Sequence, residues 1–70
     1  MADDPIYRVT EVVGTSQESV AKAIRNGVAR VGKTVRNVEW FEVTDTRGAV
    51  GADGTITFQV ALKVGFRLEG

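Results

Sequence analysis

The sequence contains 70 residues, in which nine lysines and arginines balance nine aspartates and glutamates, and it has neither cysteine nor histidine. The zero net charge argues against nucleic acid or an anionic membrane as a partner, and the missing side chains exclude disulfides and the usual zinc sites. Because so short a chain buries only about 60% of its unfolded surface, residues 1–70 are predicted to form one domain that associates with copies of itself.

The start of the chain, residues 1–5, is short and acidic and is predicted to be disordered. It lacks the apolar segment of a signal peptide, and no apolar run approaches the roughly 18 residues of a membrane-spanning helix. These features predict a cytoplasmic protein.

Residues 6–13 are rich in β-branched side chains, which predicts a first strand ending at Gly14. Apolar residues then recur three and four positions apart, which predicts an amphipathic helix over residues 17–31. On its apolar stripe lies Gly27, which indicates either a close approach of helix to sheet or simple tolerance of glycine.

Two starts fit the predicted helix. Thr15 and Glu18 form a potential capping box, and Ser16 is an equally good cap. At the other end Gly32 is predicted to stop the helix in the left-handed conformation.

Residues 35–44 are the predicted second strand, and the glycines at 48, 51 and 54 predict a hairpin loop after it. Residues 55–68 have large apolar side chains at every even position and polar or small ones at every odd position, as in a strand with one face in a core. This third strand far exceeds the usual length of about five or six residues, so it is predicted to be central.

The predicted fold is an α+β protomer of β-α-β-β order, with an antiparallel three-stranded sheet in the spatial order 1-3-2. A helix joins the first two strands, and such a crossover makes them parallel to each other. One helix cannot cover so long a sheet, and the projecting ends are expected to pack on neighbouring subunits.

Trp40 is predicted to point to the polar face of the sheet, with Gln59, Lys63 and Arg67. Covering its indole is worth roughly 4–6 kcal/mol at about 25 cal/mol per Å². Two partners fit: a neighbouring subunit, or a flat aromatic ligand stacked on the ring.

Gln59 offers a planar set of donors and an acceptor to a ring edge, although a solvated strand glutamine is the simpler interpretation. Arg47 and Arg67 are candidates for phosphate binding, or else solvated charges or intersubunit ion pairs. Without histidine and cysteine the usual nucleophile–base pairs are absent, and no enzymatic activity is predicted.

Over residues 9–68 the chain resembles the dodecins, a family of small flavin-binding proteins. The resemblance rests on four segments and their spacing: Val-Val-Gly-Thr-Ser at 12–16, Lys-Thr-Val-Arg at 33–36, Trp-Phe-Glu-Val at 40–43, and Gln-Val at 59–60 with Val-Gly-Phe-Arg-Leu at 64–68.

This resemblance implies a hollow homododecamer that stores flavin and protects it from light, with flavin pairs stacked between tryptophans of two subunits. Trp40 stands at the position of that tryptophan and Gln59 at that of the glutamine bonded to the flavin's pyrimidine edge. The bacterial branch favours FMN, with riboflavin and FAD as alternatives, and its arginines near the cofactor fall on Arg47 and Arg67.

Some bacterial dodecins also carry coenzyme A near subunit interfaces, and Arg30, Lys33 and Thr34 match that region. A competing hypothesis is a structural or adaptor homo-oligomer in which Trp40 is an interface anchor. A flavin-dependent enzyme fits less well, because a stacked flavin pair leaves no open ring face for a substrate.

Overall fold

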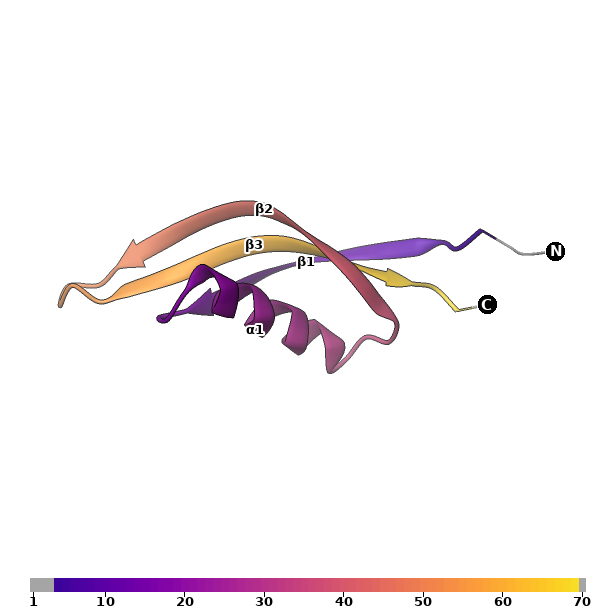
Figure 1. Cartoon of the computed structure of the whole chain (residues 1–70), viewed down its shortest axis with the longest axis horizontal. Coiled ribbons are helices and arrows are strands. Elements are labelled where there is room, and N and C mark those ends of the chain that lie inside the picture. Colours follow the sequence, from indigo (N-terminus) through magenta and orange to yellow (C-terminus); the bar gives the residue numbers. More distant parts are fainter. Residues whose placement is uncertain (1–3, 70) are drawn as a thin grey trace.

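The computed structural model describes residues 4–69 and contains a long antiparallel sheet with one helix on one of its faces (Figure 1). The elements are β1 (Tyr7–Ser16), α1 (Val20–Gly32), β2 (Val38–Val50) and β3 (Ile56–Arg67). β3 lies in the centre and pairs antiparallel with both other strands, in the order β1-β3-β2. The predicted fold and topology are therefore confirmed.

The disorder predicted for residues 1–5 falls partly on residues 1–3, which lie outside the described residues. Asp4 and Pro5 are exposed and precede the first strand.

The core lies between α1 and the even-numbered residues of β3. Val60, Leu62 and Val64 are at most 1% exposed, and they pack against Ala23 and Val31 of the helix. The alternation in residues 55–68 thus predicted the core face of β3 correctly.

β1 does not end at Gly14, as predicted, but continues to Ser16. Gly14 is a buried residue of β1 at the point where the helix crosses the strand. A Cβ there would lie 2.0 Å from the carbonyl oxygen of Ala23 and 3.1 Å from the amide nitrogen of Gly27, both on α1. Gly27 in turn lies against Leu62 and Gly14, which confirms the close approach of helix to sheet. The glycine therefore serves packing, not strand termination.

The helix begins three residues later than predicted and ends one residue later, and the residues predicted to cap and stop it do neither. Neither Thr15 nor Ser16 caps the helix, because both belong to β1; the cap is Ser19, whose hydroxyl accepts a hydrogen bond from the amide of Lys22 at 3.0 Å. Gly32 is not a left-handed stop but the last helical residue. A left-handed residue occurs instead at Asn37, with a φ of 65°, just before β2.

β2 begins at Val38, three residues later than predicted, and continues past residue 44 to Val50. Gly48, predicted to lie in the hairpin loop, is therefore part of the strand. The pairing of β2 with β3 shifts twice, between Val38 and Trp40 and between Val43 and Asp45, so one extra residue is inserted at each place. Each bulge exchanges the faces on which the following side chains lie.

The molecule is elongated, with extents of 59 × 20 × 14 Å. Figure 1 shows α1 under the middle of the sheet, the β2–β3 hairpin projecting at one end and both termini at the other. Large apolar side chains remain exposed on the projecting parts, Val50 at 76% and Ile56 at 50%.

Candidate functional site

The face of the sheet opposite α1 carries the odd-numbered side chains of β3 and those of β1 and β2 that pair with them; it is called the open face. Trp40 pairs with Gly65 and Arg47 pairs with Gln59, so both belong to it. The predicted orientation of Trp40 toward Gln59, Lys63 and Arg67 is confirmed by this register. Val38, by contrast, pairs with Phe66 and packs on the core, because a bulge separates it from Trp40.

The indole of Trp40 lies directly over Gly65. A Cβ on this glycine would be 2.1 Å from Cε2 and 2.3 Å from Cζ2 of the indole, closer than any side chain allows. Gly65 is buried beneath the ring, while Trp40 itself stays 40% exposed. One face of the indole is thus supported by the strand, and exposed ring surface remains for a partner.

Tyr7 and Glu39 lie beside Trp40 and are hydrogen-bonded to each other. The tyrosine ring meets the indole edge-on, with ring centroids 6.2 Å apart and an interplanar angle of 62°. Its hydroxyl donates to Oε1 of Glu39 at 2.8 Å, and this hydrogen bond to a carboxylate raises the pKa of Tyr7. Nε of Arg67 lies 3.5 Å from the other oxygen, Oε2, so one carboxylate contacts both side chains.

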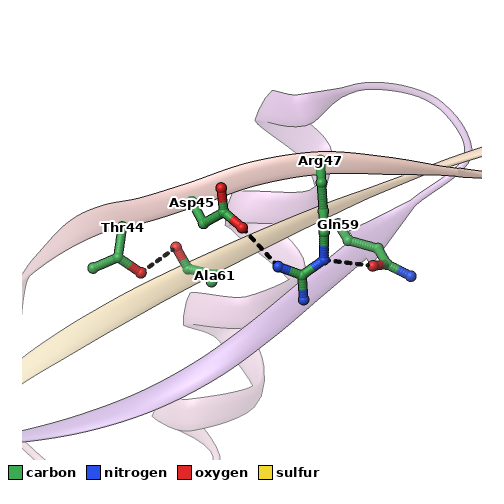
Figure 2. A network of polar contacts seen from close by, with 5 residues as sticks. All are labelled: Thr44, Asp45, Arg47, Gln59 and Ala61. Carbon is green, nitrogen blue, oxygen red and sulfur yellow. Dashed lines mark hydrogen bonds and ion pairs between the residues drawn. The ribbon is translucent and has the colours of Figure 1, made fainter.

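Arg47 joins the two strands at a second point of the open face (Figure 2). Its Nε donates to Oε1 of Gln59 at 3.0 Å, and its Nη1 lies 2.7 Å from Oδ2 of Asp45. Next to this network the hydroxyl of Thr44 donates to the carbonyl of Ala61 at 3.2 Å. The guanidinium therefore spans from a carboxylate on its own strand to an amide on the neighbouring strand.

The four predicted flavin-site residues form two groups within one chain. Trp40 and Arg67 share Tyr7 and Glu39 as neighbours, and Arg47 contacts Gln59 directly. On β3 the groups are centred on positions 65 and 59, six residues or about 20 Å apart along an extended strand. One chain does not gather all four around a single point.

Sequence reasoning missed Gly65, Tyr7, Glu39 and Asp45 as neighbours of these residues. Gly65 carried a readable signal, because it is the one glycine in the alternation of residues 55–68. Glu39 and Asp45 carried none, because their places depend on the two bulges in β2.

Two of the three residues predicted for coenzyme A line a hollow between β1 and the end of α1. The hollow measures about 350 Å³, and Arg30 and Thr34 are among its lining residues. Lys33 is exposed and does not line it.

A more apolar groove of about 480 Å³ lies on the helix side of the molecule. It runs between α1 and Phe41 at the sheet edge, and Phe41 is 48% exposed. The helix residues that line it are Ala21, Ile24, Arg25, Val28 and Ala29.

Within residues 4–69, no three or more acidic side chains are gathered closely enough to hold a metal ion. In the same part of the chain, no helix is long and apolar enough to span a membrane.

Comparison with known proteins gives consistent matches. A family model described as Dodecin matches residues 6–69. The dodecin of Thermus thermophilus is 48% identical over 64 residues, covering 91% of this chain and 93% of that protein. The calcium dodecin of Mycobacterium tuberculosis is 30% identical, covering 91% and 90%.

The solved structures agree. The structure of dodecin from Streptomyces coelicolor superposes with a TM-score of 0.89 at 51% identity and covers 99% of both chains.

Proposed function

Because this chain belongs to the dodecin family, we propose that it binds and stores flavin, with FMN preferred, in a homododecamer whose subunits enclose pairs of flavins between Trp40 side chains. The observation that carries the proposal is the indole of Trp40, which is packed flat on Gly65 and still 40% exposed. An aromatic surface that is supported by the strand and still partly exposed suits an offset-stacked ring. No catalytic role is proposed for any residue.

A site shared by two copies is supported by the separation of the groups around Trp40 and Gln59. One ring system in close contact with both needs a second copy to bring them together, and in an isologous pair each copy would supply both residues to the interface. Self-association also has support from the apolar surface that one chain leaves exposed, at Phe41, Val50 and Ile56.

Preference for FMN over riboflavin would come from one of two arginines. A guanidinium binds phosphate through parallel N–H donors, and Arg67 and Arg47 both lie on the open face. FAD, with its larger adenosine part, is the less favoured alternative.

Protection from light would follow from the stacking. An indole in contact with an isoalloxazine ring donates an electron to the excited flavin and receives it back before photochemistry occurs. This role needs no route for a substrate.

Coenzyme A remains a second candidate ligand, supported by the hollow that Arg30 and Thr34 line. Calcium is not proposed, despite the name of the Mycobacterium relative, because residues 4–69 gather no acidic cluster.

The test is a fluorescence titration of the flavin-free protein with riboflavin, FMN and FAD, together with light scattering at micromolar protein concentration. We expect a twelve-subunit mass and tightest binding of FMN. A monomeric mass, or a colourless protein that binds none of the three flavins, would favour the structural or adaptor hypothesis, in which Trp40 is an interface anchor.

A further inference from the structure

Asp45, Arg47 and Gln59 are linked in a fixed order, and this order decides which end of the Gln59 amide is free. A guanidinium has N–H donors and no acceptor, so it can bond the amide oxygen but not the amide NH2 group. With Nε of Arg47 3.0 Å from Oε1 of Gln59, the opposite amide orientation would set donor against donor. Arg47 therefore holds the oxygen and leaves the NH2 group of Gln59 free.

The bulge at Thr44 makes this arrangement possible. Val43 pairs with Leu62 on the core face, and without an extra residue Asp45 and Arg47 would continue on that face. The insertion turns both onto the open face, where Arg47 pairs with Gln59. There the Asp45 carboxylate, 2.7 Å from Nη1, holds the guanidinium beside the amide.

We propose that Arg47, held in place by Asp45, is a positioning residue that orients the Gln59 amide so that its NH2 group donates to a carbonyl oxygen on the edge of the flavin ring. This inference rests on the flavin-binding function proposed above. It assigns Arg47 to recognition of the ring and leaves the phosphate of FMN to Arg67.

The charges favour this division. A phosphate at Arg47 would approach the Asp45 carboxylate, which repels it and already occupies the guanidinium at 2.7 Å. Arg67 is held less closely, since its Nε lies 3.5 Å from Glu39, and it can exchange this partner for a phosphate at a smaller loss.

The first experiment compares riboflavin and FMN binding to the wild-type protein and to Arg47→Ala, Arg67→Ala and Asp45→Asn. Arg47→Ala is expected to weaken the binding of both ligands by the same factor, about 2- to 12-fold, which corresponds to the loss of one hydrogen bond. Asp45→Asn, which keeps the shape of the side chain, should produce a smaller loss that is again equal for both ligands. Arg67→Ala should weaken the binding of FMN and leave that of riboflavin unchanged. Loss of FMN affinity with unchanged riboflavin affinity in Arg47→Ala would overturn the assignment.

The second experiment measures coupling between the two side chains. On a Gln59→Ala background, Arg47→Ala is expected to have little further effect on riboflavin, because its role passes through the amide. If the two substitutions instead weaken riboflavin binding by their full, independent amounts, the positioning role of Arg47 is overturned, while the proposed flavin-binding function is unaffected. If neither flavin binds the wild-type protein, the proposed function is wrong, and so is the assignment of flavin as the group that the Gln59 amide recognises.

A third measurement needs no ligand. The chain has two glutamines, Gln17 and Gln59, so selective ¹⁵N labelling gives two side-chain NH2 signals. The Gln59 signal should move in Arg47→Ala and in Asp45→Asn, while that of Gln17 serves as the internal control. A Gln59 signal that is the same in all three proteins would overturn the contact.

Discussion

Gly14 and Gly65 are both places where a side chain would overlap a neighbouring group, but the groups differ. At Gly14, on the helix-covered face, a Cβ would lie 2.0 Å from the backbone oxygen of Ala23. At Gly65, on the open face, it would lie 2.1 Å from the side chain of Trp40. A backbone inside a helix cannot move aside, whereas an indole at a surface can. The first glycine therefore serves the fold, and the second serves the candidate ligand site.

Gly14→Ala should have the largest effect of the substitutions considered. We expect the free energy of unfolding to fall by about 3 kcal/mol or more, because strand and helix must separate to admit the methyl group. Urea unfolding measures this loss. The matched control is Gly32→Ala, at the end of α1, where the added Cβ meets no atom within 4 Å apart from the chain neighbours and the helix's own backbone, and where helix propensity favours alanine by at most about 1 kcal/mol. Equal effects of the two substitutions would show that the contact at Gly14 is loose.

Trp40→Ala tests the open face, where the indole lies over Gly65. Flavin affinity is expected to fall by about 2 kcal/mol or more, because the stacking surface is lost. The assembly should persist, since the proposed function places the exposed surface of the indole against flavin and not against a neighbouring subunit. Titration with FMN and light scattering measure the two properties separately. Loss of the oligomer in this variant would support an interface anchor instead of a ligand platform.

Gly65→Ala displaces the indole without removing it, and so sharpens the comparison with Gly14→Ala. The added methyl group forces the indole away from β3. The free energy of flavin binding should then weaken by about 0.5–1.5 kcal/mol, the usual contribution of an oriented aromatic pair. Unfolding should change much less than in Gly14→Ala. Near-ultraviolet circular dichroism would report the displaced indole. Unfolding as severe as in Gly14→Ala would contradict the distinction between the two glycines.

The fold could be predicted from the sequence because the alternation in β3 extends through a whole strand. One face of the central strand determined the core, and the length of this strand determined its central position. The boundaries could not be predicted in the same way. Gly14 resembles a strand end locally, yet β1 continues past it to Ser16, and the glycine is there because the helix that crosses it needs the space.

The candidate site was predictable to a smaller extent. The face of Trp40 followed from its parity relative to Glu42, which no bulge interrupts. The places of Asp45 and Arg47 follow from the extra residue at Thr44, and a single inserted residue leaves no clear mark in a pattern of polar side chains. The contact between Arg47 and Gln59 therefore emerged from the structure alone.

A moderate effect is expected from salt. FMN should bind more tightly than riboflavin at low ionic strength, by about 1 kcal/mol, because Arg67 meets the phosphate partly in solvent. The difference should shrink as salt rises, while stacking on Trp40 is unaffected. Titrations at several salt concentrations measure the ratio of the two affinities. A ratio of one at every concentration would show that no arginine contacts the phosphate.

A change in affinity as modest as that of Gly65→Ala should come from Gln59→Ala, and this variant separates binding from photoprotection. A net neutral hydrogen bond is worth about 0.5–1.5 kcal/mol, so this variant should bind flavin more weakly. Its bound flavin should nevertheless stay dark, because electron transfer needs the ring overlap that Trp40 provides and an edge hydrogen bond does not. Trp40→Phe should show the opposite: some stacking remains, but phenylalanine is a much poorer electron donor, so the bound flavin should emit more strongly. Emission lifetimes at saturating protein measure both variants, and bright FMN in the wild-type protein would refute protection even with the binding site intact.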